Sequence, residues 1–580
     1  MPRLFRFALG GCLLLFSLAV SAAQSCDTMV GRLASLEGQV EVQSSRASAW
    51  QPATLNQSLC QGDTVRAGAR SRATVALVNQ AVLRIDENTA MRLDNISGVA
   101  EERSVLSLLK GAFQSFSRKP RGFEVSTPYL NGSIEGTEFV FRVTDDEAIL
   151  TVFEGIVLAS NAQGSASVSG GEAVAAKAGQ APQARTVVRP RDAAQWSLYY
   201  PPILATGGGQ GVSPALRQAA DDLSVGRVDE ARSGVEQAIA AGGADAGLAY
   251  ALRAVINVVQ NQPDQALADA GQGVSLSPDS TAAKIALSYA QQAKYRISEA
   301  RDSLQQAVAQ QPENALAHAR LAELQLMLGE RAQASASAQQ AVALAPNLGR
   351  TQITLGFSAL AEFRNEAARA AFEKAIALDS ADPLPHLGLG LAKISDGDLL
   401  AGRQEIEIAV GLGSSDALLR SYLGKAYFEE KRGPLDADQF DIAKQLDPND
   451  PTPHLYSGIA RQTENRPVEA ARDLEKSIEL NDNRAAYRGR LLLDKDRAAR
   501  GTSLSRAYND LGFSQLGVNE STRSLTLDPA NDSAHRFLSD TYRNVRRREI
   551  SRVSELFQAQ MMQDNNINPV QPSVSSTNLN

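Results

Sequence analysis

The chain has 580 residues and a formal net charge of −7, a length that suits several domains or one long repeat array. Lysine and arginine residues are scattered, whereas phosphate binding needs basic residues clustered on one face, so nucleic acid is not an expected partner. The one basic run, Arg546 to Arg548, is followed by Glu549. We interpret it as a solvated helix terminus.

Residues 1–23 have the pattern of a signal peptide. Arg3 and Arg6 precede a long apolar run, and small residues at Ser21 to Ala23 precede a predicted cleavage site. No later segment approaches the roughly 20 apolar residues of a membrane span. We therefore expect an exported protein that is soluble or is held at a membrane by something else.

Export changes the interpretation of the cysteines. Cys12 would leave with the signal peptide, so Cys26 and Cys60 remain. An oxidising compartment favours a disulfide between them, which would add roughly 3–4 kcal/mol by closing the loop. The alternative is a two-thiol metal site, but the nearest histidine lies beyond residue 300.

Residues 24–190 show short alternating apolar runs separated by Gly, Asn and Asp, which predict an all-β domain, either a sandwich or a roll. Within it, the stretch FEVSTPYLNGSIEGTEFVF at residues 123–141 predicts a strand, a turn and a second strand. No residue in it could perform chemistry, and we expect its residues to maintain the fold rather than to contact a partner directly.

Four segments of this half resemble the FecR domain: GDTVRAGARSRATVAL from Gly62, the preceding Trp50-Gln51-Pro52, the 123–141 stretch, and VFEGIV from Val152. The resemblance implies a periplasmic β module that contacts an envelope partner. In that family a cytoplasmic segment controls a sigma factor, but the sequence has no such N-terminal segment and no retained transmembrane helix. Direct sigma-factor control is therefore not implied.

Residues 191–212 interrupt both patterns and predict a linker. Tyr199 to Pro202 should be extended and Gly207 to Gly211 flexible. The glycines lack the spacing and the following Lys-Ser/Thr of a phosphate-binding loop. We expect Trp196, Tyr199 and Tyr200 to hold the linker against a neighbouring domain.

Residues 213–548 contain an internal repeat of 34 residues. One position recurs at this spacing through Pro278, Pro312, Pro346, Ser380, Ser414 and Pro448. Small residues at the eighth and twentieth positions and a larger one at the twenty-fourth allow two helices to cross closely. The period and this pattern resemble the tetratricopeptide (TPR) repeat, which implies an all-α solenoid of about nine or ten units with a concave inner face.

The resemblance also implies which side chains line the concave face of that solenoid. The second, fifth, ninth and twelfth positions of each first helix are mostly apolar: Ile285, Tyr289, Leu326, Ile353, Phe357, Leu360, Leu387, Leu391, Ile394, Phe428, Leu455 and Ile459. An apolar groove predicts a bound amphipathic helix or extended segment. The alternative is that these residues belong to the core or are capped by the chain's own tail.

Residues 549–580 predict an amphipathic helix followed by a polar tail. Ile550, Val553, Leu556, Phe557 and Met561 share one helical face, so the helix could cap the array or fill the groove. The longer block from ELNDNRAAYRGRLLLDKD to the final NINPVQPSVSSTNLN, residues 479–580, resembles the part that precedes an outer-membrane barrel in some longer FecR–repeat proteins, which implies an outer-membrane association through a partner.

Catalytic and metal-binding constellations are not expected. His318, His386, His454 and His535 occupy one position of separate repeats, roughly 20 Å apart between alternate units, which is too far to share an ion. No nucleophile motif or supported carboxylate pair is present. We expect neither an enzyme, a cofactor nor a small-molecule substrate.

The sequence therefore predicts a periplasmic scaffold that binds protein partners of the cell envelope. The alternatives are an envelope signal-transduction protein, in which the β domain senses a receptor, and the periplasmic part of an outer-membrane export system.

Overall fold

The computed structural model describes residues 28–98, 102–117, 123–187, 189–204, 212–480, 491–543 and 545–562, with only the backbone for 135–137 and 491–499. The predicted signal peptide and Cys26 lie outside these residues, so cleavage and the Cys26–Cys60 disulfide stay predictions. None of the helices in the described ranges is both long and apolar enough to cross a membrane.

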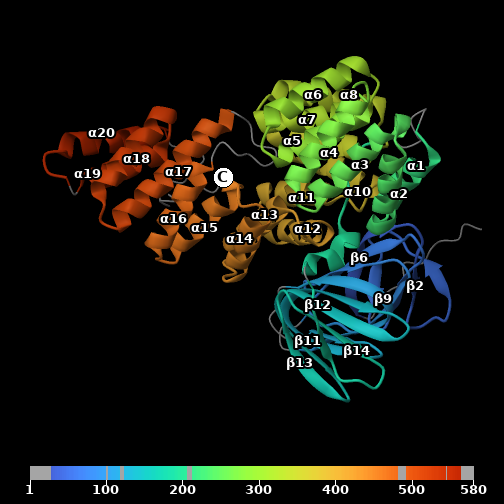
Figure 1. Cartoon of the computed structure of the whole chain (residues 1–580). Coiled ribbons are helices and arrows are strands. Elements are labelled where there is room, and N and C mark those ends of the chain that lie inside the picture. Colours follow the sequence, from blue (N-terminus) through green and yellow to red (C-terminus); the bar gives the residue numbers. More distant parts are fainter. Residues whose placement is uncertain are drawn as a thin grey trace, which may run out of the picture.

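The N-terminal half forms an all-β domain, as predicted (Figure 1). Its strands are β1 Met29–Glu37, β2 Val40–Gln43, β3 Trp50–Pro52, β4 Ser58–Cys60, β5 Thr64–Ala67, β6 Arg72–Leu77, β7 Val82–Ile85, β8 Thr89–Asn95, β9 Ser104–Phe116, β10 Phe123–Ser126, β11 Asn131–Val143, β12 Glu147–Asn161, β13 Gly164–Ser169, β14 Ala173–Lys177 and β15 Gln183–Arg185. Their alternating apolar residues form one core.

The strands join into one hydrogen-bonded network whose main path is β15-β14-β12-β11-β10-β9-β7-β6-β1-β4. The pairings are antiparallel except for β9 with β10. The expected strand–turn–strand at 123–141 is β10 and β11, paired from Phe123–Ile134 to Val125–Gly132.

Strand β9 changes partners at Gly111. Before this residue β9 pairs with β8 and β10, and from it onward with β11 and β7. Gly111 has φ +92°, and a Cβ here would lie 2.2 Å from Thr89 Oγ1, so a side chain would not fit. Strand β9 is thereby shared between two sets of neighbouring strands.

The connection to the helices is largely packed. Its 3-10 helix, η1 Pro190–Ser197, carries a buried Trp196, and Leu198, Tyr200 and Ile203 after it join the same apolar core as the helices. Tyr199 reaches the repeats through its hydroxyl, which donates to Asp379 Oδ2 at 2.9 Å. The predicted aromatic residues therefore hold this segment in place.

The C-terminal half forms ten antiparallel helical pairs within the described residues. The helices are α1 Pro214–Ser224, α2 Val228–Ala241, α3 Ala246–Val259, α4 Pro263–Leu276, α5 Thr281–Ala293, α6 Ile297–Gln310, α7 Ala315–Leu328, α8 Arg331–Leu344, α9 Gly349–Ala361, α10 Asn365–Leu378, α11 Pro383–Ser395, α12 Leu399–Leu412, α13 Ala417–Glu429, α14 Leu435–Leu446, α15 Pro451–Thr463, α16 Pro467–Glu479, α17 Leu491–Asp510, α18 Ser514–Leu527, α19 Asp532–Tyr542 and α20 Glu549–Met562, with a short 3-10 turn, η2 Gly243–Asp245, before α3. Each pair is one unit of the predicted solenoid.

The small-and-large pattern produces the close crossings. A Cβ on Gly356 would lie 2.6 Å from the ring of Phe372, and one on Gly424 would lie 2.6 Å from the ring of Phe440. In both pairs, the eighth residue leaves the space that the twenty-fourth fills.

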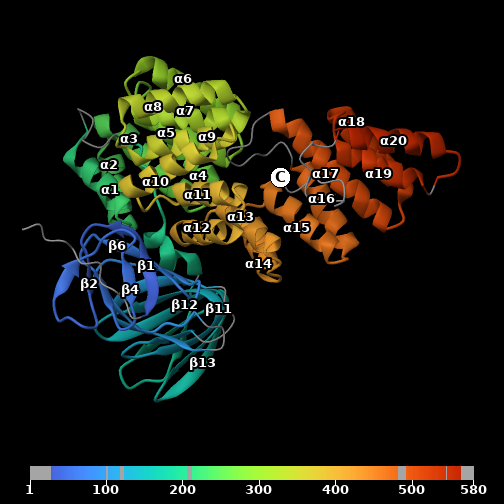
Figure 2. The same cartoon turned by 180° about the vertical axis from the view of Figure 1, so that it is seen from behind.

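The solenoid winds tightly enough for its early and late units to touch. Asn261, after α3, donates to the Ser415 carbonyl at 3.0 Å, and the Tyr295 hydroxyl, after α5, donates to Asp447. The β domain lies against α1, α2 and α12, while α15 to α20 extend away on the other side (Figures 1 and 2).

Candidate interaction sites

The winding of the helices forms a central, partly open cavity of about 290 Å³. It is lined by residues from the first helices of successive pairs and, from the connecting segment, by Leu198, Tyr199 and Pro201. The chain's own connecting segment therefore forms part of the wall of its concave face.

Two guanidinium groups in the cavity wall are already neutralised. Arg320 pairs with Glu323 at 2.7 Å and stacks over the Tyr289 ring at 3.9 Å. Arg350 contacts Glu323 at 3.0 Å and Asp382 at 2.9 Å. Burial raises the pKa of Asp382 to about 6, because the charged carboxylate loses its hydration.

Three further aspartates line the cavity beyond these pairs. Asp416 and Asp450 cap the N-termini of α13 and α15, accepting backbone N–H groups, and Asp447 accepts from the Tyr295 hydroxyl. Carboxylates thus outnumber basic groups in a cavity that also presents tyrosine rings. This lining suits a small, positively charged group.

A second site is the interface between the β domain and the repeats. Helix α12 packs on β6 and β7. A Cβ on Gly411 would lie 2.5 Å from Val82 Cγ1, so this glycine is what allows the backbone of α12 to approach the sheet. Val82 and Phe116 join the helices in one apolar cluster.

An ion pair without solvent exposure crosses this interface. Arg420 Nη2 of α13 lies 2.6 Å from Glu138 Oε2 of β11, and both side chains are fully buried. Gln114 donates to Glu138 Oε1 at 2.8 Å and to Ser414 Oγ at 3.1 Å. Arg420 also donates to the Ser414 carbonyl at 2.8 Å. The network joins β9 and β11 to the loop before α13.

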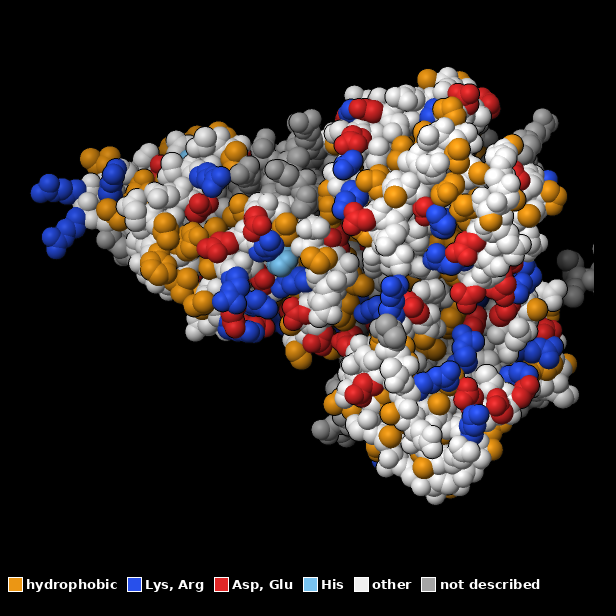
Figure 3. Space-filling model, viewed as in Figure 1, with side chains coloured by type: hydrophobic (Ala, Val, Ile, Leu, Met, Phe, Trp, Pro, Cys, Tyr) orange, Lys and Arg blue, Asp and Glu red, His pale blue; other side chains and the backbone are white. Residues whose placement is uncertain are grey.

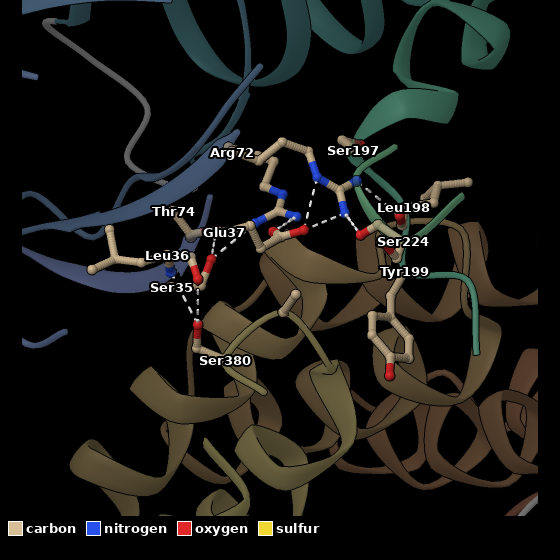
Figure 4. Close-up of polar contacts among 12 residues, drawn as sticks. Ser35, Leu36, Glu37, Arg72, Thr74, Ser197, Leu198, Tyr199, Ser224 and Ser380 are labelled. Carbon is tan, nitrogen blue, oxygen red and sulfur yellow. Dashed lines mark hydrogen bonds and ion pairs between the residues drawn. The ribbon is translucent and has the colours of Figure 1, made fainter. Parts of the chain in front are cut away.

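A neighbouring part of the interface joins β1 and β6 to the repeats and the connecting segment (Figure 4). The Leu36 N–H donates to Ser380 Oγ at 3.0 Å. Arg72 donates to the Trp196 carbonyl at 2.5 Å and to the Ser224 carbonyl at 2.9 Å.

The same arginine pairs with Glu37, as does Arg84. Burial alone would raise the pKa of Glu37, but the two guanidinium groups outweigh it and lower that pKa.

Glu405 of α12 connects three elements. It contacts Arg32 of β1 at 3.3 Å, His386 Nδ1 at 2.7 Å and Lys393 at 3.0 Å. Burial opposes ionisation, yet the hydrogen bond and charge of His386, with Arg32 and Lys393, lower the pKa of Glu405 to about 2.

The apolar residues predicted to line the groove mostly do not face open space. Tyr289 lines the cavity. The other predicted groove residues lie in helix–helix contacts, where Leu360, Leu391, Ile394 and Phe428 are half-buried and Ile285, Leu326, Ile353, Phe357, Leu387, Leu455 and Ile459 are buried. This burial favours the alternative that these positions belong to the core of the tightly wound solenoid, and binding of a partner along them stays a prediction.

The amphipathic helix was expected to cap the array or to fill the groove. It is α20, the second helix of the tenth pair, and it packs on α19 at the end of the array, which agrees with the capping role. It does not line the central cavity.

The four histidines have separate surroundings. His386 pairs with Glu405, His454 lies 3.3 Å from Asp473, and His535 pairs with Glu555, while His318 Nε2 contacts the Pro312 carbonyl at 2.8 Å. Each histidine therefore contacts its own partner within or next to its own repeat.

The sequence analysis does not predict this interface, although the sequence contains one signal for it. Four of the six recurring positions are proline, and the two that are serine, Ser380 and Ser414, both hydrogen-bond to the β domain. A proline there could not supply a hydroxyl. Glu138 was overlooked because a single carboxylate in a strand carries no sign of its distant partner.

Comparisons with known proteins agree with this architecture. A model of the FecR protein family matches residues 63–158. The solved structures that resemble the chain include the Cut9–Hcn1 hetero-tetramer of the APC/C (14% identity, TM-score 0.49, covering 63% of this chain and 74% of that one), the human IFIT1 dimer with m7Gppp-AAAA (12%, 0.38, 60% and 80%) and MamA (16%, 0.25, 30% and 94%). At these scores the similarity carries no functional argument. No curated protein matches the chain.

The chain thus carries a FecR domain followed by a TPR-like helical solenoid. Modules of these two kinds are associated with protein interaction and signalling, and they are typically non-catalytic.

Proposed function

We propose that the protein is a non-enzymatic scaffold of the periplasm, exported by its signal peptide and stabilised there by a Cys26–Cys60 disulfide. Its repeats hold a segment of an envelope protein, and its FecR domain supports the repeats. The observation that carries the proposal is the central cavity, which is formed by repeat helices and lined by tyrosines and surplus carboxylates.

The size and charge of the cavity define the bound segment. A volume of about 290 Å³ lies at the lower end of ligand pockets and is far too small for a helix. Since Glu323 and Asp382 already neutralise the two arginines, the further carboxylates of Asp416 and Asp447 favour a basic group. The partner would insert a lysine or arginine side chain from an extended segment.

In-cell photo-crosslinking tests this proposal. A photoreactive phenylalanine analogue replaces Tyr289, and the adducts are sequenced by mass spectrometry. We expect one envelope protein, cross-linked beside a lysine or arginine. The matched control places the analogue at Phe363, which is 82% exposed outside the cavity, and should not capture that protein. Adducts confined to residues 198–201 of the same chain would contradict the proposal and define the cavity as an internal seal.

The polar interface favours a second candidate, envelope signal transduction. The Glu138–Arg420 pair and the Glu405 network join the FecR domain to the repeats through ionic contacts. A receptor that bound the FecR domain could release it from the repeats and so change what they bind. A chain in which the FecR domain is locked covalently to the repeats would distinguish this candidate function from the scaffold function.

A further inference from the structure

The last helix, α20, is amphipathic in the reverse sense from the other repeat helices. Its packed side, towards α19, carries polar and small residues: Ser539 donates to the Arg552 carbonyl, His535 pairs with Glu555, and Ala559 is buried. Its outer side carries a stripe of exposed apolar side chains, namely Ile550 (88% exposed), Val553 (55%), Phe557 (58%) and Met561 (62%).

Comparison with α10 shows that this stripe is not a surface on which the next repeat would stack. Arg547 before α20 has the positive φ of Phe363 before α10, and the buried Ala559 corresponds to Ala375. In this alignment the apolar stripe of α20 falls on Glu366, Arg369, Glu373 and Ala377 of α10. Three of these residues are exposed although the next helical pair stacks on α10, and Arg369 pairs with Asp396 of that pair. A face that is mostly charged and exposed on α10 is therefore apolar on α20.

Basic residues surround the start of this helix. Arg546, Arg547 and Arg548 are exposed in the preceding turn, and Arg548 lies over the ring of Tyr542 at 5.6 Å. In the space-filling view, basic side chains project beside hydrophobic ones at the end of the molecule that α19 and α20 form (Figure 3). This end of the molecule lies far from the FecR domain (Figure 1).

We infer that α20 binds the surface of an anionic phospholipid bilayer. An amphipathic helix with aromatic and aliphatic side chains on one face and adjacent arginines lies in the interfacial plane, its apolar face among the acyl chains. The arginines of the preceding turn would contact the anionic headgroups. The inference does not depend on the central cavity, so it goes beyond the proposed scaffold function and gives it a place at a membrane.

Vesicle flotation of the full chain tests the inference. The vesicles are phosphatidylcholine, with or without about one third phosphatidylglycerol. We expect the protein to float with the anionic vesicles and to dissociate from them at high salt. The double variant Phe557→Ser/Met561→Ser should lower the partition coefficient about tenfold or more, because both side chains leave the apolar face. Arg546→Glu/Arg547→Glu should lower it comparably by reversing the charge.

Two control variants change the same residue types elsewhere. Phe363→Ser removes another exposed phenylalanine, and Arg523→Glu reverses another exposed arginine; both should float as the unaltered chain does. Failure of the unaltered chain to float with anionic vesicles would overturn the inference. So would equal flotation of the Phe557→Ser/Met561→Ser variant. If that variant instead dissociated a dimer in analytical ultracentrifugation, the surface would belong to a second copy and the lipid assignment would be wrong.

Discussion

The FecR domain interface and the last helix place polar and apolar residues in opposite ways. The interface between the FecR domain and the repeats, which lies within the chain, contains a buried ion pair, Glu138–Arg420, and a buried carboxylate, Glu405. The surface that the chain leaves open, on α20, is apolar. Buried charges need their own partners, so they specify one docking arrangement. An exposed apolar surface is stabilised when any large apolar environment covers it.

The largest effect is expected from breaking the buried pair. Arg420→Ala would remove the guanidinium group that pairs with the fully buried Glu138 carboxylate, and should lower the free energy of unfolding by about 3–5 kcal/mol. Urea unfolding measures this loss. Glu138→Gln/Arg420→Met should recover most of it, because neither residue is then charged. The control, Arg103→Ala in the exposed Arg103–Glu124 pair, should cost below about 1 kcal/mol.

Glu405 should make the interface sensitive to acid. Its folded-state pKa, about 2, lies below the ordinary value of 4.5. The contribution of Glu405 to the free energy of unfolding is therefore complete at pH values above 4.5 and is lost as the pH falls towards 2. Glu405→Gln should lower the free energy of unfolding by about 3 kcal/mol at neutral pH, and by less than about half of that amount near pH 3. Equal costs in urea unfolding at the two pH values would contradict the assignment.

The helix crossings inside the solenoid should be intolerant of added volume. Gly356→Ala places a Cβ 2.6 Å from the Phe372 ring and should cost about 1–3 kcal/mol by overpacking. Gly271 of α4 is the matched control, since a Cβ there meets nothing within 4 Å. Gly271→Ala should be neutral or should raise the melting temperature, because alanine favours the helix by up to about 1 kcal/mol.

A smaller effect is expected from Ser380, one of the two serines that replace proline at the recurring position of the repeat. Ser380→Pro restores the residue found at most of the recurring positions, but it removes the hydrogen bond from the Leu36 N–H. We expect a loss of about 1 kcal/mol in thermal unfolding, and the same loss for Ser380→Ala. A gain in stability from the proline would show that the hydroxyl contributes nothing to docking.

The repeat architecture was predictable because period and residue size are local properties. The 34-residue spacing and pairs such as Gly356 with Phe372 specify how neighbouring helices cross. The strands of the FecR domain were predictable from alternation, including the β10–β11 turn.

The central cavity was not predictable, because it depends on how tightly many repeats wind. Contacts such as Asn261 with Ser415 join units more than 150 residues apart, and small angles that accumulate along the array decide whether they form. The same winding buried Phe357 and Leu387, which the repeat pattern placed on an open face.

An engineered disulfide tests the central claim, that the repeats bind their partner while the FecR domain stays docked. A Cβ at position 411 would lie 3.2 Å from Val82 Cβ, slightly less than the roughly 3.5–4.5 Å in a disulfide. A small outward shift of α12 should therefore let Val82→Cys/Gly411→Cys lock the two parts together. Photo-crosslinking from position 289 is then compared between the locked chain and each single-cysteine chain. The scaffold account predicts the same captured protein in the same yield. Loss of capture only in the oxidised, locked chain would contradict it and would mean that release of the FecR domain controls binding.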